Sequence, residues 1–390
     1  MPDNKIKILH ISPDGKLYGT ERHILALVKH SNRSKIDHYV ATPERGNFND
    51  ELDKIGVQYF IAGRKHGYKN KLDGITAEGT KELYRLMKKE KFDIVHSHLN
   101  SFGGIVGRIA GAGSVVHTRH GVFWSEEELE NISVKDKYFQ KIKSGIFDLT
   151  IAIGEYEKNT MIGKFDYDEN KIRVTVNGVD TDELISKINR TISKKDLFGT
   201  DEFIIGTVGR LERQKGFNML IEAASKIKDS LENIKFVIIG DGSCKEELIN
   251  LRDEFGLQEK IEFIPYKDNI PDYVHNFDIY ISTSLWEGMS YSVQEAMAIG
   301  KPVIALTSEN VSGLKELIVD GVSGILIEKN YTEELAEKIK SLIKDEKYRN
   351  YLGENAQERE KNYFQEWRTA ADMDKVYTEL YDSKNLIKQS

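Results

Sequence analysis

Short apolar segments alternate with amphipathic segments of helical length along almost all of this chain, and this alternation restricts the possible folds more than any other feature. Short strands that are each followed by a helix form parallel sheets, which helices then cover on both faces. The pattern runs through the first half of the chain and restarts after the turn Asn177-Gly178. The sequence therefore predicts an α/β protein with two doubly wound, Rossmann-like domains.

The same pattern places the expected strands and the domain boundary. The expected strands are residues 5–11, 38–42, 94–98, 114–118 and 149–153 in the first series, and residues 203–208, 236–240, 261–264, 279–283, 303–305 and 325–327 in the second. We place the first domain at residues 1–178 and the second at residues 179–366. The last segment, residues 367–390, has a helical pattern, and we expect it to return to the first domain.

Composition and charge exclude several classes of protein. Hydrophobic residues make up 39% of the chain and charged residues 31%, which is too apolar for a disordered protein, and the net charge of −7 disfavours a dedicated nucleic-acid binder. No apolar run is long enough to span a membrane, and the N-terminus is interpreted as a first strand rather than a signal peptide. The one cysteine, Cys244, cannot form an internal disulfide, so we expect a cytoplasmic protein.

Several common catalytic motifs are absent from the sequence. No strand is followed by G-x-G-x-x-G, and the chain lacks both the phosphate-binding pattern G-x-x-x-x-G-K-[ST] and the G-x-S-x-G serine turn. Dinucleotide-dependent hydride transfer, ATP hydrolysis and serine-esterase chemistry are therefore disfavoured.

One loop of the second half carries two cations. In GTVGRLERQKGF, residues 206–217, a strand leads into a turn of small residues, and Arg210 and Lys215 follow before the next helix begins. Cations beside the unpaired N–H groups of a helix N-terminus make an anion site. The alternative is a pair of solvated surface cations.

A second loop carries two carboxylates. In the segment at residues 282–305, Glu287 lies in the loop after a strand, and Glu295 lies in the early turns of a helix that begins near Ser290. A carboxylate can accept hydrogen bonds from two neighbouring hydroxyls, so Glu295 is a candidate for a ribose and Glu287 for a hexose. The N–H groups of Met289, Ser290 and Tyr291 would face phosphates between them. The alternative is that both glutamates are ordinary helix-entry residues.

With these two loops, the second half resembles the group-one glycosyltransferases, a retaining, nucleotide-sugar-dependent family with the GT-B fold. The resemblance rests on EGMSYSVQE with its Glu-x7-Glu spacing, on GRLERQKG and on DGVSGILIE. The first half is similar through YGTE, DIVHSH, HTRHG, VNGVD and IAIGE, in which Tyr18, Val176 and Gly154 depart from the family pattern. The resemblance covers roughly residues 5–365.

The resemblance implies a role for each matching residue. In the donor-binding second domain, Arg210 and Lys215 would bind the donor diphosphate, Glu287 the sugar and Glu295 the ribose. From the acceptor-side first domain, His120 would meet the sugar, and Gly19 would lie near the diphosphate. His96 and His98 are interpreted as hydrogen-bonded strand-end residues rather than metal ligands. No Asp-x-Asp pattern lies near the donor loops, so we expect neither a metal nor a cofactor.

The family chemistry defines the expected function. The chain would transfer a hexosyl or N-acetylhexosaminyl group from a nucleotide diphosphate sugar to a hydroxyl acceptor, with retention of the anomeric configuration. We expect a UDP-sugar as the first choice of donor and a GDP-sugar as the second. The expected process is bacterial cell-surface polysaccharide or glycolipid synthesis. The alternatives are a nucleotide-sugar 2-epimerase of the same fold and a catalytically silent sugar-nucleotide binding protein. Residues 1–178 carry a charge of +4 and the rest −11, so basic segments at residues 64–71, 81–91 and 135–143 are candidates for peripheral contact with an anionic membrane. The alternative is a solvated basic surface.

Overall fold

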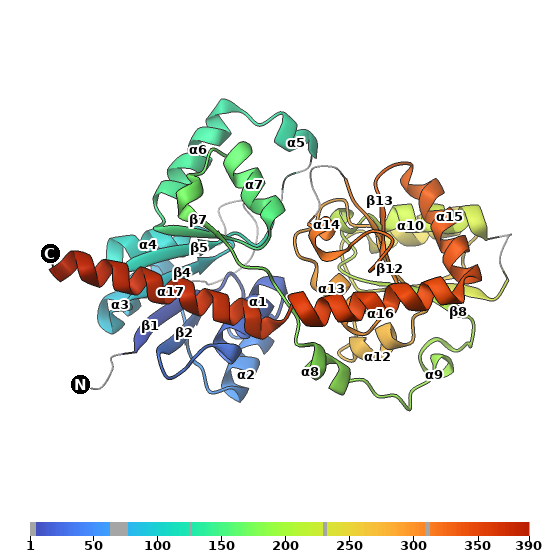
Figure 1. Cartoon of the computed structure of the whole chain (residues 1–390), viewed down its shortest axis with the longest axis horizontal. Coiled ribbons are helices and arrows are strands. Elements are labelled where there is room, and N and C mark those ends of the chain that lie inside the picture. Colours follow the sequence, from blue (N-terminus) through green and yellow to red (C-terminus); the bar gives the residue numbers. More distant parts are fainter. Residues whose placement is uncertain are drawn as a thin grey trace. The chain divides into compact units, whose positions relative to one another are not determined.

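The structure is a computed structural model that describes residues 5–62, 77–122, 124, 126–228, 232–308 and 313–389. The basic segment at residues 64–71 lies outside these ranges. The chain forms two compact units (Figure 1). Unit 1 comprises residues 1–121, 129–177 and 366–390, and unit 2 comprises residues 122–128 and 178–365.

Unit 1 is built on a parallel sheet of seven strands in the order β3-β2-β1-β4-β5-β6-β7. Its strands are β1 (Ile6–Ile11), β2 (Ile36–Thr42), β3 (Gln58–Ile61), β4 (Ile94–His98), β5 (Ser114–Thr118), β6 (Leu149–Ala152) and β7 (Ile172–Val174). Its helices are α1 (Gly19–His30), α2 (Asn47–Lys54), α3 (Ala77–Glu90), α4 (Phe102–Ala110), α6 (Val134–Gly145), α7 (Glu155–Gly163) and α17 (Glu366–Gln389); α5 (Glu126–Glu130) spans the unit boundary.

The core of unit 1 includes the last helix of the described chain. Met373 and Tyr377 of α17 are buried in one cluster with Ile8 of β1 and Ile36 of β2. Helix α17 lies beside α1 (Figure 1), and the Asp374 carboxylate accepts hydrogen bonds from the hydroxyl of Ser31 at 2.7 Å and the N–H of Asn32 at 2.8 Å. The prediction that the C-terminal helix returns to the first domain is confirmed.

Unit 2 contains a parallel sheet of six strands in the order β10-β9-β8-β11-β12-β13. Its strands are β8 (Phe203–Val208), β9 (Ile234–Ile239), β10 (Ile261–Ile264), β11 (Ile279–Ser282), β12 (Val303–Leu306) and β13 (Ile325–Ile327). Its helices are α8 (Thr181–Ser186), α9 (Lys194–Phe198), α10 (Phe217–Ile227), α11 (Lys245–Glu254), α12 (Ile270–His275), α13 (Tyr291–Ala298), α14 (Leu314–Leu317), α15 (Tyr331–Lys344) and α16 (Glu346–Tyr363).

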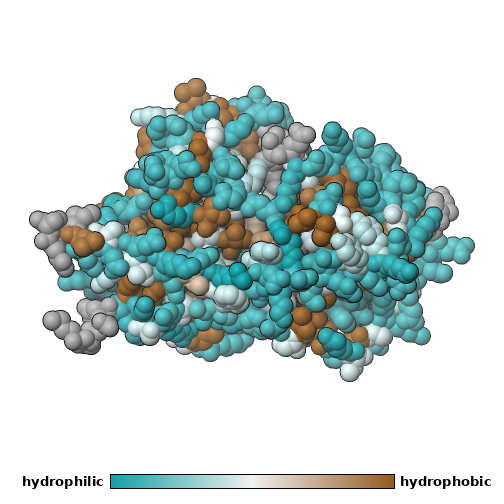
Figure 2. Space-filling view, viewed as in Figure 1, coloured by the Kyte–Doolittle hydropathy of each residue, from teal (hydrophilic) through white to brown (hydrophobic). Residues whose placement is uncertain are grey.

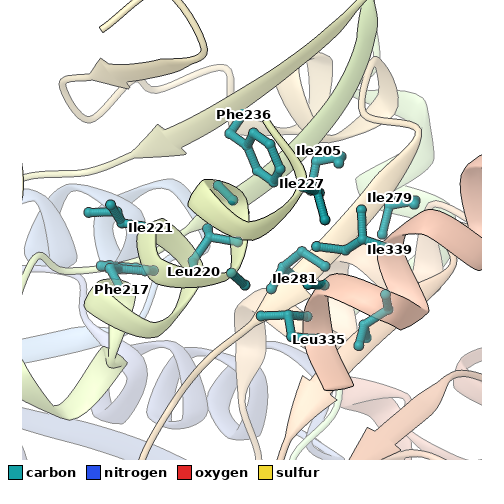
Figure 3. Packing of buried hydrophobic residues seen from close by; sticks show 14 of the residues in the cluster. Ile205, Phe217, Leu220, Ile221, Ile227, Phe236, Ile279, Ile281, Leu335 and Ile339 are labelled. Atoms are coloured by element: carbon teal, nitrogen blue, oxygen red, sulfur yellow. The ribbon is translucent and has the colours of Figure 1, made fainter. Parts of the chain in front are cut away.

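The main core of unit 2 lies between its sheet and two helices. Figure 3 shows apolar side chains of α10 and α15 packed against those of the strands: Phe217, Leu220, Ile221, Ile227, Leu335 and Ile339 against Ile205, Phe236, Ile279 and Ile281. Burying each of these large aliphatic or aromatic side chains contributes roughly 1.5–3 kcal/mol before entropy is counted. The rigid sheet fixes where the loops at its carboxyl edge begin. The predicted α/β fold class, with two Rossmann-like halves, is confirmed.

Candidate active site

The two loops singled out from the sequence leave neighbouring strands of unit 2. Strand β8 pairs in parallel with β9 on one side and β11 on the other, with Ile205 opposite Ile279 and Gly206 opposite Tyr280. The strands that follow β8, which are β9 and β10, lie on one side of it, and those that follow β11, which are β12 and β13, lie on the other side. The carboxyl ends of β8 and β11 therefore flank a topological switch point. Ligands of open α/β sheets bind at such points.

Backbone and side-chain contacts hold the two loops together. The N–H of Leu285 donates to the carbonyl of Gln214 at 2.8 Å, and the Gln214 amide donates to the carbonyl of Trp286 at 2.9 Å. Gly216 precedes α10 as its N-cap with a φ of 58°, and a Cβ there would lie 2.3 Å from the carbonyl oxygen of Thr283. Glycine is therefore required at position 216 both for its left-handed backbone and for the close approach of the second loop.

Lys215 and Glu287 form an ion pair across the two loops. Each side chain is only 15% exposed, and the hydroxyl of Ser284 donates a second hydrogen bond to the same Glu287 carboxylate at 3.0 Å. The backbone of this residue is also fixed, because the N–H of Gly313 donates to the Glu287 carbonyl at 2.8 Å. The loop therefore presents the carboxylate and the ammonium group side by side in a defined orientation.

Glu295 lies near the same place on α13, which begins at Tyr291. It is half-buried, and its charge acts on the buried Tyr280 of β11 together with that of Glu287. The pKa of the Tyr280 hydroxyl is raised well above its ordinary value. Burial is the largest cause, and the negative charges of the two carboxylates add to it. That hydroxyl donates to the carbonyl of Val208 at the end of β8, 3.3 Å away. Both glutamates thus lie close enough to this buried phenol for their charges to act on it.

The other predicted residues of unit 2 lie on the same loops. Arg210 follows β8 and is exposed. Met289 and Ser290 are buried just before α13, with 5% and 4% exposure, and Tyr291 is half-buried. The structure brings Lys215 and Glu287 into direct contact, places Glu295 nearby, and leaves Arg210 at the solvent-facing start of the first loop.

In unit 1, Gly19 is the exposed first residue of α1. Two residues later, the buried Glu21 carboxyl accepts hydrogen bonds from the hydroxyl of Ser12 at 2.8 Å and the N–H of Tyr18 at 3.3 Å. Burial raises the pKa of Glu21 to about 7, although both hydrogen bonds oppose this shift. Glu21 therefore fixes the turn that leads into Gly19.

His120 is one end of a row of four imidazole rings. His120 Nε2 lies 3.1 Å from His98 Nδ1, His98 Nε2 lies 3.1 Å from His10 Nδ1, and His10 Nε2 lies 2.9 Å from His38 Nδ1. His120 is partly exposed, whereas His10 and His98 are fully buried. Burial is the main cause that holds the pKa of each of these histidines below its ordinary value, so the rings are neutral at pH 7.

Sequence reasoning named His120 but not His10, His23 or His38. Three neighbouring strands each carry a histidine: His10 lies near the carboxyl end of β1, directly opposite His96 of β4, and His38 lies nearer the amino end of β2. The sequence does show histidines in three strand segments, IKILHI, IDHYVAT and IVHSH. That these histidines lie together follows only once the order of the strands in the sheet is known. His96 itself is fully hydrogen-bonded, with its two ring nitrogens each 2.7 Å from the hydroxyls of Tyr377 and Thr118.

Comparison with known proteins identifies the family. Residues 188–359 match the model of the glycosyl transferases group 1, and residues 18–183 match that of glycosyltransferase family 4. An uncharacterized glycosyltransferase of Methanocaldococcus jannaschii is 32% identical over 76% of this chain and 78% of its own length. The chain belongs to the group 1 glycosyltransferases.

Two further comparisons extend over nearly the whole chain. The Escherichia coli UDP-Gal:alpha-D-GlcNAc-diphosphoundecaprenol alpha-1,3-galactosyltransferase is 29% identical over 93% of this chain and 94% of its own length. The crystal structure of Anabaena HepE in complex with UDP and glucose superposes with a TM-score of 0.81 at 22% identity, over 96% of this chain and 100% of that one. The likeness to HepE shows that the fold is shared.

Proposed function

We propose that this chain is a retaining glycosyltransferase that moves a hexosyl or N-acetylhexosaminyl group from a UDP-sugar to a hydroxyl of a lipid-linked glycan. The observation that carries the proposal is the pair Lys215–Glu287 at the switch point of unit 2, with Glu295 beside it. This arrangement offers a cation for a diphosphate and two carboxylates for sugar hydroxyls.

The chemistry follows from these groups. A nucleotide diphosphate leaves readily when fixed positive charge stabilises its new negative charge, which Arg210, Lys215 and the backbone N–H groups of residues 289–291 would do without a metal. The acceptor oxygen then attacks the oxocarbenium-like sugar from the face that the phosphate left, and the departing phosphate oxygen takes the acceptor proton. Retention by this route needs no protein nucleophile. Glu287 would hold the sugar hydroxyls, and Glu295 the ribose.

The named relatives support the choice of substrates. The Escherichia coli relative uses UDP-galactose and acts on a diphosphoundecaprenol-linked sugar. A second relative, from Campylobacter jejuni, is an N-acetylgalactosaminyltransferase whose acceptor is also diphospho-undecaprenol-linked and which is 27% identical over 55% of this chain. We therefore place UDP-galactose and UDP-N-acetylgalactosamine before GDP-sugars, and a polyprenyl diphosphate glycan as the acceptor.

Helix α6 supports contact with the membrane that holds such an acceptor. None of its residues is buried, and Val134, Tyr138, Phe139 and Ile142 are 86%, 63%, 57% and 49% exposed. Positions 134, 138 and 142 share one face of a helix. Figure 2 shows hydrophobic residues at the surface in this part of unit 1. Lys135, Lys137, Lys141 and Lys143 on the same helix suit an anionic leaflet.

Among the described residues, no helix combines the length and the apolar composition that a membrane span requires. Contact of α6 with a membrane is tested directly, by sedimentation with vesicles of neutral or anionic lipid. We expect binding to anionic vesicles that falls when Tyr138 and Phe139 are both changed to Ser. Tyr363→Ser is the matched control, because this α16 residue of unit 2 is 61% exposed. Equal binding by all three proteins would contradict the role of α6.

One assay tests the proposed transfer against its alternatives. The enzyme is incubated with UDP- and GDP-sugars and a synthetic lipid diphosphate glycan in the presence of EDTA, and the products are analysed by mass spectrometry and NMR. We expect a longer glycan with an α-linkage from an α-linked donor. A new sugar nucleotide formed without acceptor would instead indicate a 2-epimerase, and nucleotide binding without any product would indicate a silent binding protein.

A further inference from the structure

Three histidines of unit 1 bring their ring nitrogens close together. His23 of α1, His98 of β4 and His120 after β5 each offer a ring nitrogen, and these three atoms lie within 4.8 Å of one another. His23 and His98 are fully buried, whereas His120 is partly exposed. The cluster therefore lies mostly inside unit 1, and His120 is its one partly exposed member.

The tautomer of His23 is set by its neighbour. His23 Nδ1 lies 2.7 Å from the side-chain oxygen of Asn177, which can only accept a hydrogen bond, so Nδ1 carries the ring proton. His23 Nε2 then bears a lone pair, and this buried atom has no hydrogen-bond partner among the described residues. An unpaired acceptor in a buried site is costly unless a cation or donor meets it.

Two further imidazole nitrogens, one on His98 and one on His120, can offer lone pairs beside that of His23. When His98 Nε2–H donates to His10 Nδ1 and His10 Nε2–H donates to His38 Nδ1, every one of these rings keeps a single proton. His98 Nδ1 then faces His120 Nε2 across 3.1 Å. Without a metal, His120 Nε2–H donates to the lone pair of His98 Nδ1; when the His120 proton moves to its Nδ1, both facing nitrogens bear lone pairs that one cation can accept.

We propose that His23 Nε2, His98 Nδ1 and His120 Nε2 form a binding site for Zn²⁺, with the fourth position open. Zn–N bonds of about 2.0–2.1 Å in a tetrahedral site separate neighbouring nitrogens by about 3.3 Å. The His98–His120 separation of 3.1 Å already fits this value. The Asn177 oxygen on His23 Nδ1 and the ring of His10 on His98 Nε2 are the outer hydrogen-bond partners that metal-bound imidazoles require.

A second triple in the same region is a poorer candidate. The ring nitrogens of His10, His96 and His98 also lie within 4.8 Å of one another. Both nitrogens of His96, however, are already hydrogen-bonded to hydroxyls at 2.7 Å. A metal at that place would have to break a hydrogen bond of His96 as well as the one between His10 and His98, whereas the proposed site gives up only the His98–His120 hydrogen bond, because His23 Nε2 has none.

The site is tested by direct binding on the metal-free full chain, without nucleotide. Zn²⁺ is titrated against a chromophoric chelator, and X-ray absorption at the zinc edge reports the bound atoms. We expect one Zn²⁺ per chain with three nitrogen ligands at about 2.0 Å. Absence of stoichiometric binding, or ligation by oxygen alone, would overturn the proposal, and neither measurement depends on a variant that folds.

Variants then assign the ligands. Asn177→Ala removes only an outer hydrogen-bond partner, so we expect it to lower Zn²⁺ affinity by about 10- to 100-fold. His23→Ala removes a ligand and should lower Zn²⁺ affinity by more than this. His117→Gln is the matched control, since His117 is equally buried but its Nε2 lies 3.3 Å from the carbonyl of Leu99 and outside the cluster. Zn²⁺ affinity that His23→Ala leaves unchanged, or that only His117→Gln lowers, would contradict this ligand set.

Zn²⁺ bound at this site would affect catalysis, an expectation that rests on the proposed function. Zn²⁺ would withdraw His120 from the sugar, so stoichiometric Zn²⁺ should inhibit transfer, and EDTA should restore it. Zn²⁺ binding without inhibition would overturn this regulation while leaving the metal site in place. Failure of the binding test would overturn the metal site and leave the transferase proposal unaffected.

Discussion

Lys215 and Glu287 form an ion pair between loops that follow two adjacent strands, and each side chain is 15% exposed. The ammonium group that we assign to the diphosphate is therefore already held beside the carboxylate that we assign to the sugar. Partial burial makes this pair stronger than a surface salt bridge and gives Lys215 a fixed position before any donor binds.

The first prediction concerns the diphosphate. Lys215→Ala and Arg210→Ala should each weaken UDP binding by roughly 10- to 100-fold, because a hydrogen bond to a charged group is worth about 1.5–3 kcal/mol. Isothermal titration calorimetry measures the affinity. Lys226→Ala is the control, since it removes a cation that pairs with Glu333 on the surface of the same unit. UDP affinity equal to wild type in both test variants would rule out this diphosphate site.

The second prediction separates the two glutamates. Glu295→Ala should weaken UDP itself, because we assign Glu295 to the ribose. Glu287→Ala should leave UDP affinity the same or tighter, since it releases Lys215 from its ion pair, while turnover falls because the sugar loses its contact. Calorimetry and initial rates on the same preparations test both statements. Loss of UDP binding in a folded Glu287→Ala protein would show that the division of roles is wrong.

The third prediction concerns His120, which we propose contacts the donor sugar. His120→Ala should lower turnover by about 10- to 1000-fold, which corresponds to about 1.4 kcal/mol for each factor of ten. UDP affinity should stay near that of wild type. The melting temperature is measured in parallel, because His120 also hydrogen-bonds His98 and its loss can destabilise unit 1. A destabilised variant with normal turnover per folded molecule would remove His120 from the active site.

The fourth prediction is that acid unfolds unit 1. Burial lowers the pKa of His23 from 6.5 to about 4, so below pH 6.5 the unfolded chain binds a proton that the folded chain refuses. Stability is then lost as the pH falls from 6.5 toward 4, by on the order of 3 kcal/mol for this group. The same sign holds for the other buried histidines of unit 1, His10, His38, His96, His98, His117 and His120.

Carboxyls with raised pKa values oppose this trend, since burial raises the pKa of Glu21 and Asp374 in unit 1 and of Glu360 in unit 2. Glu21, with its pKa raised from 4.5 to about 7, stabilises the fold below pH 4.5 and loses that contribution as the pH rises to 7. Among the described residues these three carboxyls are fewer than the seven histidines of unit 1 whose pKa values burial lowers, so we expect stability to rise with pH. Urea unfolding between pH 7.5 and 5.5 measures it, and His117→Gln should reduce the proton uptake on unfolding by about one. Stability that does not change over this range would contradict the neutral, buried state of the rings.

The sequence allowed the fold class and the two donor loops to be predicted because strong apolar strands and glycine-rich turns are local signals. Strands β3 and β7 were missed, since both lie at the edges of the seven-stranded sheet, where strands are short and need less apolar surface. The contact between Lys215 and Glu287 depends on β8 and β11 being neighbours, which strand order decides. The histidine row also required the register of three strands.

The returning helix α17 links the folding of unit 1 to the end of translation. Tyr377 binds His96 across 281 positions of the chain, and the cluster around Ile8 and Ile36 stays incomplete until α17 is added. A ribosome therefore finishes all of unit 2 before it makes the piece that completes unit 1. Unit 1 can therefore complete its core only after α17 has been translated, and premature termination near residue 365 would remove α17 from that core while keeping every residue of unit 2.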